Sequence, residues 1–322
     1  MKILITGIHG FVGGNLVNLL CTNNQIYGLD IVAPEKEGVV KTFSWDDLDS
    51  DKVPDMDAII HLAGKAHDLK KTSGPEVYFR VNTELTQKMY DWFLKSTAKK
   101  FIFFSSVKAA ADFLSGDILT EDIVPNPIGP YGESKIKAEA YIQEKLGVKA
   151  GQHDWTDKSD KRTYILRPCM IHGPGNKGNL NLLYSIVKKG IPWPLGAFEN
   201  RRYFTSIGNL GFAIDGLLFK DVKSGIYNMG DDDALSTNEL IEVICSVLGK
   251  KAHIWHIPKG LMNGCAKIGD VFHLPLNSER ITKLTENYVV SNAKIKKALG
   301  VTKMPVSAKE GLTLTIKSFA QQ

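Results

Sequence analysis

Three glycines at regular spacing follow an apolar run at the start of the chain. Residues 2–6 read as a buried parallel strand, because aliphatic and β-branched residues follow one another without polar alternation. Gly7, Gly10 and Gly13 come next, and apolar residues then recur at helical spacing as far as Leu20. The glycines therefore lie in a turn between a strand and a helix. Such a turn lets the backbone approach a pyrophosphate, and the helix N-terminus offers its N–H groups to the phosphates.

An acidic residue supports this interpretation. Residues 25–30 read as the second strand, which ends in Asp30, 23 residues after Gly7. A carboxylate at this position accepts hydrogen bonds from the 2′-hydroxyl of an adenosine ribose and repels a 2′-phosphate. We therefore expect NAD rather than NADP as the cofactor.

The composition is that of a globular protein. The 322 residues are 43% hydrophobic and 23% charged, and 40 basic against 35 acidic residues leave a net charge of +5. Because the lysines occur in scattered pairs with no long run, we expect no nucleic acid partner. The four cysteines are far apart and form no C-x-x-C motif, so we expect free thiols and no metal site. With no leader-like segment and no apolar run of bilayer length, we expect a cytoplasmic protein without a membrane partner.

Small and hydroxyl residues follow two further predicted strands. Residues 57–62 form a buried strand that is closed by Ala63 and Gly64, and residues 101–104 form another that ends in two serines. Small residues at the carboxyl end of a parallel strand let a ligand lie across the edge of the sheet. His61, within the first of these strands, is interpreted as a histidine held by hydrogen bonds, since no second functional group accompanies it.

Tyr131 and Lys135 lie four residues apart, on one face of a predicted helix. A tyrosine ionises near pH ~10, and a neighbouring ammonium together with an oxidised nicotinamide would lower its pKa. The phenol could then take a proton from an alcohol as hydride leaves the same carbon. A serine hydroxyl from the preceding strand end, Ser105 or Ser106, could donate a hydrogen bond to the developing oxyanion.

Together these motifs resemble the extended short-chain dehydrogenase/reductase family. Within it they resemble the nucleotide-sugar epimerases (the UDP-glucose 4-epimerase-like group), dehydratases and 4-ketoreductases. The resemblance is strongest over residues 1–180. The matching segments, in family order and at family spacing, are residues 6–13, Asp30, residues 61–64, residues 81–86, Ser105 and Ser106, Tyr131 with Lys135, and Arg167 with Pro168.

The resemblance implies a Rossmann-type, doubly wound parallel sheet with a smaller α/β substrate lobe at the C-terminal side. The implied NAD-binding domain comprises residues 1–172 plus about 203–229. The implied nucleotide-sugar domain comprises about 173–202 plus 230–322. A homodimer is left open.

The resemblance also implies a role for individual residues. Tyr131 is the proton-transferring base, Lys135 holds the nicotinamide ribose, and Ser106 lies beside the reacting oxygen, with Ser105 as its rival. In the substrate half, Asn179 (or Asn181) meets the nucleotide diphosphate and Arg202 clamps it, since a planar guanidinium suits phosphate oxygens. The cofactor contacts so implied are Gly7, Gly10, Phe11, Val12, Gly13, Asp30, Leu62, Ala63, Gly64, Asn82, Ser105, Tyr131, Lys135 and Pro168.

The departures from the family pattern narrow the reaction. Dehydratases carry an Asp-Glu pair where this chain has Val107 and Lys108, so we expect no dehydratase activity. Epimerases and 4-ketoreductases share the Ser/Tyr/Lys chemistry, but Asp30 favours NAD, whereas a biosynthetic reductase more often uses NADPH. We therefore expect a 4-epimerase, and the resemblance implies a UDP-hexose or UDP-N-acetylhexosamine as its substrate. The alternative is a UDP-4-keto-sugar reductase, and a redox-silent binding protein is disfavoured because Tyr131 and Lys135 are intact.

Overall fold

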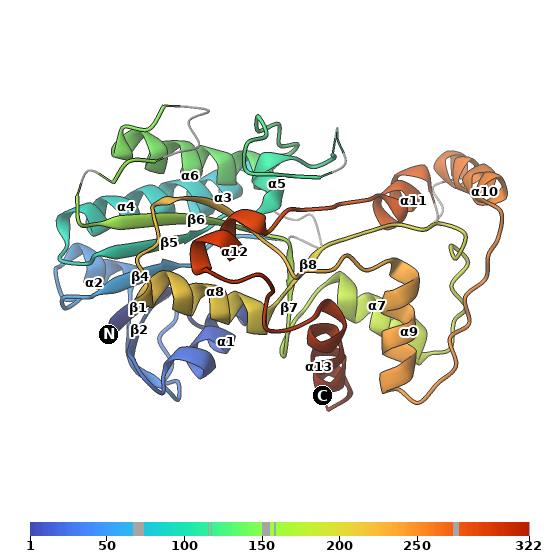
Figure 1. The fold of residues 1–322 in the computed structure, drawn as a ribbon, viewed down its shortest axis with the longest axis horizontal. Coiled ribbons are helices and arrows are strands. Elements are labelled where there is room, and N and C mark those ends of the chain that lie inside the picture. Colours follow the sequence, from blue (N-terminus) through green and yellow to red (C-terminus); the bar gives the residue numbers. More distant parts are fainter. Residues whose placement is uncertain are drawn as a thin grey trace.

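A parallel sheet forms the centre of the molecule. The computed structural model describes residues 1–66, 74–114, 116, 118–149, 155–157, 159–272 and 277–321. The sheet has seven strands in the order β3-β2-β1-β4-β5-β6-β9, all of them parallel (Figure 1). The strands are β1 (Lys2–Thr6), β2 (Gln25–Leu29), β3 (Val39–Phe43), β4 (Ala58–His61), β5 (Lys100–Phe104), β6 (Arg162–Pro168) and β9 (Gly225–Met229).

The strand order reverses its direction between β1 and β4. Thr6, at the end of β1, pairs with Leu29 of β2 on one side and with His61 of β4 on the other. A ligand binds such a sheet in the crevice outside the carboxyl ends of the strands at this reversal. The order confirms the predicted Rossmann-type, doubly wound α/β fold. It also places the glycine-rich turn after β1 beside the residues that follow β4.

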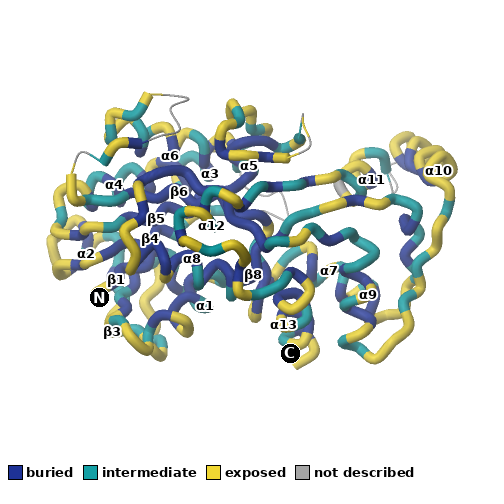
Figure 2. Tube along the Cα trace, viewed as in Figure 1, coloured by how far each residue is buried: buried dark blue, intermediate teal, exposed yellow. Residues whose placement is uncertain are grey.

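Two layers of helices cover the sheet, and each layer encloses its own apolar core. Figure 2 shows the strands between them as the most deeply buried part of the chain. The helices on one face are α1 (Phe11–Leu20), α8 (Ile207–Phe219) and α12 (Ala293–Leu299). The helices on the other face are α2 (Trp45–Asp49), α4 (Leu85–Lys95) and α6 (Pro130–Leu146).

The helical region that precedes β5 is divided into three parts. α3 (Pro75–Tyr78) is followed by a π-helical segment, Phe79–Glu84, which leads into α4. π-helical turns inside α-helices occur frequently at functional sites. This one contains Asn82, a predicted cofactor contact, whose side chain is buried.

A smaller lobe lies beyond the carboxyl edge of the sheet. Its helices are α7 (Asn179–Lys188), α9 (Thr237–Val247), α10 (Lys259–Phe272), α11 (Ser278–Thr285) and α13 (Ala308–Ala320). α5 (Val107–Ala110) packs against α6 and β6, and the short strands β7 (Met170–His172) and β8 (Phe204–Ser206) pair with each other, with β8 in contact with both α8 and α13. Apolar residues of α7, α9, α10 and α13 share a third core. The division into two domains stays a prediction. α12 lies within the segment 230–322 but packs on the sheet side, against α8 and β9.

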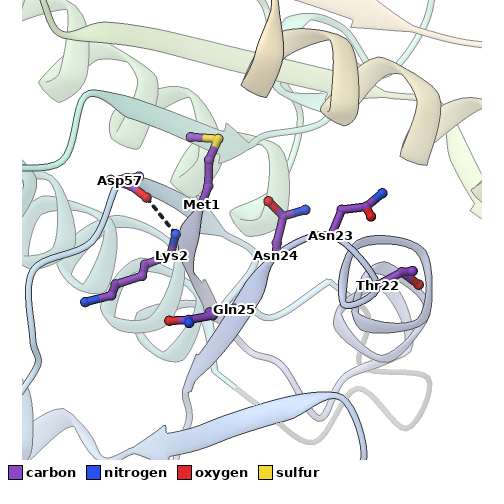
Figure 3. Close-up of a pocket in the computed structure, with 7 residues that line it drawn as sticks. All are labelled: Met1, Lys2, Thr22, Asn23, Asn24, Gln25 and Asp57. Atoms are coloured by element: carbon purple, nitrogen blue, oxygen red, sulfur yellow. Dashed lines mark hydrogen bonds between the residues drawn. The ribbon is translucent and has the colours of Figure 1, made fainter.

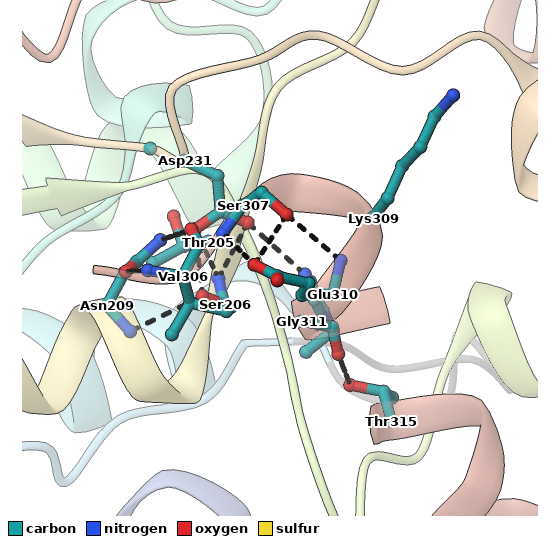
Figure 4. Close-up of polar contacts among 12 residues, drawn as sticks. Thr205, Ser206, Asn209, Asp231, Val306, Ser307, Lys309, Glu310, Gly311 and Thr315 are labelled. Atoms are coloured by element: carbon teal, nitrogen blue, oxygen red, sulfur yellow. Dashed lines mark hydrogen bonds and ion pairs between the residues drawn. The ribbon is translucent and has the colours of Figure 1, made fainter. Parts of the chain in front are cut away.

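A buried polar junction joins this lobe to the sheet (Figure 4). Asp231 follows β9 and is fully buried, and its carboxylate accepts hydrogen bonds from the Ser206 hydroxyl at 2.9 Å and the Asn209 amide at 2.6 Å. The Asn209 amide also donates to the carbonyl of Val306 at 2.7 Å and accepts from its N–H at 2.9 Å. Asp231 and Asn209 therefore hold together β8, α8 and the segment that leads into α13.

The glycine-rich turn adopts a conformation that side chains would disturb. Gly7 has a φ of +68°, in the left-handed region, and a Cβ added there would lie 3.0 Å from the backbone nitrogen of Ala63. A Cβ on Gly13 would lie 2.5 Å from the carbonyl oxygen of Gly7 and 2.7 Å from the Cα of Ile8. Because these neighbours are backbone atoms, they cannot move aside as a side chain could. The close approach of α1 to the turn requires glycine.

A buried ion pair fixes α6 on the sheet. Glu139 of α6 and Arg167 of β6 are almost completely buried. The guanidinium donates to both carboxylate oxygens, from Nη2 to Oε2 at 2.6 Å and from Nε to Oε1 at 3.0 Å. The hydroxyl of Ser105, just after β5, donates to the same carboxylate. This bidentate contact joins α6, β6 and the end of β5 in one geometry.

Removing one partner of this pair should be strongly destabilising. Arg167→Met would leave the Glu139 carboxylate buried without its counter-charge, and we expect the free energy of unfolding to fall by ~3–5 kcal/mol. Lys99→Met is the matched control, because the Lys99–Asp160 ion pair has both side chains more than half exposed and should contribute far less. Urea denaturation measures the loss of unfolding free energy in both variants. Equal losses would contradict the prediction that the buried pair stabilises the fold more than the exposed pair.

Gly13 should be far less tolerant of a methyl group than its neighbour. Gly13→Ala forces the carbonyl of Gly7 away from α1, and we expect the melting temperature to fall by roughly 4 °C or more. In Gly14→Ala the added Cβ meets only the Lys36 ammonium, at 3.5 Å. That variant should match or exceed the wild type, because alanine favours the helix. Melting curves in which both variants lose the same stability would refute the close-approach explanation.

Candidate active site

Motifs that are far apart in the chain meet at the carboxyl edge of the sheet. The N–H of Ala63, after β4, donates to the hydroxyl of Thr6, just before the glycine-rich turn, at 2.9 Å. α6 begins at the same edge, and its first two turns carry Tyr131 and Lys135. The predicted cofactor and reacting residues on this edge are Gly7, Gly10, Phe11, Val12, Gly13, Asp30, Leu62, Ala63, Gly64, Asn82, Ser105, Ser106, Tyr131, Lys135 and Pro168.

Tyr131 and Ser106 contact each other across this edge. Ser106 is the N-cap of α5, where its hydroxyl accepts the N–H of Lys108 at 3.2 Å, and it also hydrogen-bonds the Tyr131 phenol. Burial raises the pKa of Tyr131 above its ordinary value, while the bond to Ser106 opposes the rise. The chain by itself therefore does not produce the lowered tyrosine pKa that the sequence suggested, because burial outweighs its polar neighbours.

The two serines that end β5 have different partners. The Ser105 hydroxyl donates to the buried carboxylate of Glu139, beneath the edge. Successive side chains of an extended backbone point in opposite directions, so Ser106 faces the other way, towards Tyr131. Of the two serines left open by the sequence, Ser106 is the one in contact with the tyrosine.

Lys135 is buried below Tyr131. Its ammonium donates to the carbonyl of Phe104 at 2.7 Å and lies 5.0 Å from the centroid of the Phe103 ring. Burial lowers the pKa of Lys135 to about 8, and the Glu139 carboxylate one turn further along α6 opposes the fall. A Cβ on Gly64 would lie 3.1 Å from Nζ. The glycine after β4 thus leaves the room that the ammonium occupies.

Asn82 connects the loop after β4 to α6. Its Oδ1 accepts the N–H of Lys65 at 2.7 Å, and its Nδ2 donates to the Lys65 carbonyl at 3.1 Å and to the Ser134 hydroxyl at 2.9 Å. Ser134 in turn donates to the carbonyl of Tyr131 at 2.9 Å. Asn82 therefore positions both the first turn of α6 and the loop that faces it. Its direct contact with the cofactor stays a prediction.

His61 is held by hydrogen bonds at the end of its strand, as predicted. Its Nδ1 lies 2.8 Å from the Thr6 hydroxyl and its Nε2 lies 3.0 Å from the Thr86 hydroxyl. The Thr86 hydroxyl donates its proton to the carbonyl of Asn82 at 2.7 Å, so it accepts from Nε2, which carries the imidazole hydrogen. In the neutral ring Nδ1 then accepts the proton of the Thr6 hydroxyl. Burial, aided by the charge of Lys135, lowers the pKa of His61 to about 3. The imidazole is therefore neutral at pH 7.

Asp30 lies beside the glycine-rich turn. Its carboxylate accepts the N–H of His9 at 3.1 Å and the N–H of Ile31 at 2.8 Å. A carboxylate has about four acceptor positions, so two hydroxyls of a ribose can still be accommodated. Next to the turn, a hollow of about 300 Å³ is lined in part by Gly10, Phe11 and Lys36.

These residues fit a dinucleotide. The three glycines leave the backbone uncovered, and Gly10 begins α1 without a side-chain hydrogen bond to its first turn. The N–H groups of that turn are therefore not capped by a side chain and could bind an anion. Lys36, at the same hollow, adds a positive charge that the sequence motifs did not single out. Phosphate oxygens between α1 and Lys36 would be met by donors and a cation from two sides.

Arg202, which is predicted to bind the substrate diphosphate, already forms an ion pair with Glu286. The guanidinium of Arg202 donates to Glu286 Oε1 at 2.9 Å. Burial lowers the pKa of Arg202, and the Glu286 carboxylate opposes the fall. Asn179 is the exposed first residue of α7, whereas Asn181 is part of the helix cap, accepting the N–H of Gly178 at 3.1 Å. Asn179 is thus the more accessible of the two, and the roles of Asn179 and Arg202 stay predictions.

Tyr288 links this clamp region to Ser106. It bridges to Arg202 in a strand-like contact, and its hydroxyl donates to the carbonyl of Ala111 at 2.6 Å. The ammonium of Lys108 lies 4.5 Å from the centroid of its ring. α5, which Ser106 caps, is therefore held against the smaller lobe. The sequence did not indicate Glu286 or Tyr288 as site residues. No motif spacing relates Glu286 to Arg202, 84 residues earlier, or Tyr288 to Val107, about 180 residues earlier.

A second hollow, of about 480 Å³, lies elsewhere (Figure 3). Met1, Lys2, Gln25 and Asp57 line part of it, at the amino ends of the strands. It is therefore at the opposite edge of the sheet from Tyr131. Within the described ranges, no group of three or more His, Cys, Asp or Glu side chains is arranged to hold a metal ion. No helix in the described part of the chain has the length and apolar character to cross a membrane.

Known proteins resemble this chain over its whole length. UDP-glucose 4-epimerase of Vibrio cholerae is 29% identical over 99% of this chain and 96% of its own. N-acetyl-alpha-D-glucosaminyl-diphospho-ditrans,octacis-undecaprenol 4-epimerase of Escherichia coli O157:H7 is 28% identical over 94% of this chain and 86% of its own. The crystal structure of UDP-N-acetylglucosamine 4-epimerase from Bacillus cereus matches with a TM-score of 0.74 and 20% identity, covering 100% of this chain and 98% of that one, which supports the fold.

A family model matches most of the sheet-forming part of the chain. Its description is "NAD dependent epimerase/dehydratase family", and the match covers residues 3–230. This is well over half of the chain, and it includes every predicted cofactor residue. The match confirms the resemblance found in the sequence and the expected cofactor, NAD. The chain belongs to the NAD dependent epimerase/dehydratase family.

Proposed function

We propose that this enzyme interconverts a nucleotide sugar with its C4 epimer and that Tyr131 is the base. The observation that carries the proposal is the contact of Ser106 with Tyr131 above a buried Lys135, at the sheet edge where the glycine-rich turn lies. Bound NAD would supply the acceptor and donor of hydride at this edge. Tyr131 removes the proton of the sugar 4-hydroxyl and later returns it, while Ser106 donates a hydrogen bond to the same oxygen.

The proton balance of Tyr131 depends on its neighbours. In the chain alone burial raises the pKa of its phenol, so the proton stays on the oxygen until positive charge arrives. Lys135, whose charged form is held against the Phe104 carbonyl, supplies part of that charge. Stabilising phenolate only in the assembled site would prevent unproductive ionisation of the empty enzyme.

We infer a diphosphate-linked hexose or N-acetylhexosamine as the substrate. The relatives from V. cholerae and E. coli are, by name, epimerases of UDP-glucose and of a diphospho-linked N-acetylglucosamine. In this chain Asn179 and Arg202 would meet the diphosphate, and Arg202 would exchange the Glu286 carboxylate for phosphate oxygens. We propose UDP as the nucleotide.

The reaction itself has a direct test. An epimerase returns the hydride to the sugar it came from, so the cofactor need not leave. We expect the purified protein to carry tightly bound NAD(H) and to interconvert a UDP-hexose or UDP-N-acetylhexosamine with its C4 epimer without added cofactor, as followed by NMR. Protein that arrives empty and consumes stoichiometric NADH or NADPH with a UDP-4-keto sugar would instead be a reductase.

Removing the Tyr131 hydroxyl should abolish most of the activity. Tyr131→Phe keeps the ring but has no proton to transfer, and we expect turnover to fall by ~10²-fold or more with NAD affinity near that of the wild type. Tyr141→Phe is the matched control, since it removes a hydroxyl from the same helix where the partner is Asp91. Unchanged turnover in Tyr131→Phe would exclude it as the base.

The buried charge of Lys135 should have a pH-dependent effect on stability. Its pKa is lowered to about 8 from 10.5, so below about pH 8 the fold carries a buried ammonium that it disfavours. This penalty is relieved as pH rises from about 8 towards 10.5, whereas Lys135→Met never has it. The stability of the wild type relative to Lys135→Met should therefore rise across this window, while turnover of the variant is low throughout.

Denaturation midpoints at about pH 7 and about pH 10 measure the change for Lys135→Met. Lys137→Met, at an exposed position of the same helix, is the control for removing a lysine from α6. A difference between wild type and Lys135→Met that does not vary with pH would contradict the lowered pKa.

A further inference from the structure

α10 carries a row of large apolar side chains that nothing in the described structure covers. Leu261, Ile268, Val271 and Phe272 are 61, 56, 71 and 70% exposed. At 100° per residue, Leu261, Ile268 and Phe272 lie within about 60° of one another on the helix surface. Figure 2 shows this helix as a largely exposed element at the far end of the smaller lobe. A row of this kind on the surface of a protein indicates an interaction site.

The row is separate from the side by which α10 packs on its lobe. Met262, Ala266 and Gly269 are buried and form the packed side. The polar residues of the helix, among them Lys259 and Lys267, occupy the third side. α10 is therefore apolar over more of its circumference than packing on the lobe requires. An apolar side, a polar side with lysines, and a length of 14 residues are typical of helices that lie in the surface of a bilayer.

The charge around α10 identifies the kind of surface that it fits. From Lys250 to the end of α11 at Thr285 the sequence has six basic residues (five Lys and one Arg) and two acidic ones, a net charge of +4 against +5 for the whole chain. Trp255, in the segment before α10, is 56% exposed. Basic residues are attracted to anionic lipid headgroups, and exposed aromatic residues favour the membrane interface. Two copies of this segment facing each other would instead bring like charges together.

We propose that α10 docks this enzyme on the surface of an anionic bilayer, with Leu261, Ile268 and Phe272 inserted at the boundary of headgroups and acyl chains. The helix lies on the bilayer and does not cross it. This departs from the sequence-based expectation of no membrane partner, which considered only apolar runs of spanning length. The inference does not depend on which sugar the enzyme converts.

Docking would take place on the candidate substrate half. Asp270 of α10 accepts the hydroxyl of Ser278 at 2.6 Å and its N–H at 2.9 Å, which fixes α10 to the start of α11. α11 is followed by Glu286, the partner of Arg202. The bilayer would thus contact the same helical unit that ends at the predicted diphosphate clamp.

Vesicle sedimentation tests the proposal with the full-length protein. We expect it to sediment with vesicles of phosphatidylglycerol and phosphatidylcholine, much less with phosphatidylcholine alone, and less at high salt. Ile268→Ser combined with Phe272→Ser should lower the bound fraction by about tenfold or more. Leu314→Ser, which replaces an equally exposed leucine of α13 in the same lobe, is the control and should bind as the wild type does.

The remaining outcomes overturn the proposal. No sedimentation of the wild type with anionic vesicles, or equal sedimentation of the double variant, would show that α10 is not a membrane contact. Equal binding to neutral vesicles would refute the anionic assignment. Sedimentation velocity without lipid identifies the competing occupant, because a dimer that the double variant loses would mean that a second copy covers the row. Unchanged melting curves establish that the substitutions left the fold intact.

Discussion

The buried contact between Glu139 and Arg167 is the interaction on which the candidate site depends. It fixes the rotation of α6 relative to β6, and because Glu139 also accepts the Ser105 hydroxyl, it sets the direction of the backbone at the end of β5. Because the Ser105 side chain points towards Glu139, the Ser106 side chain points the opposite way, towards Tyr131. One carboxylate, absent from every motif considered, thus determines which serine contacts the tyrosine and how α6 presents its first two turns.

The sequence predicted the fold and the edge of the sheet well, for reasons that are local. Parallel strands buried on both faces appear as apolar runs, and Gly7 and Gly13 are required by backbone clashes within a few residues or at one neighbouring strand end. His61 was interpreted correctly because no second functional group accompanies it in the sequence, and in the structure its partners are the hydroxyls of Thr6 and Thr86. The patterns that predicted these features lie in short stretches of sequence, although Gly7 and His61 meet partners more than 50 residues away.

What the sequence could not predict depends on contacts between distant segments. The π-helical turn around Asn82 breaks a smooth helical period for the sake of bonds to Lys65 and Ser134, the second of them 52 residues later. The engagement of Arg202 by Glu286 joins positions 84 residues apart. The raised pKa of Tyr131 reflects burial, which a one-dimensional pattern of charges does not contain. The sequence did not predict a helix at α10, because three glycines interrupt its apolar periodicity.

The polar junction at Asp231 determines how the two lobes can come apart. Its carboxylate is fully buried and bonded to Ser206 and Asn209, and Asn209 is in turn tied to Val306 before the last helix. Separating the lobes would break hydrogen bonds around a buried carboxylate, and a hydrogen bond to a charged group stabilises a fold by ~1.5–3 kcal/mol. The junction therefore opposes hinge motion between the sheet and the last helix, so loops and side chains are the parts of the molecule best able to open for a substrate.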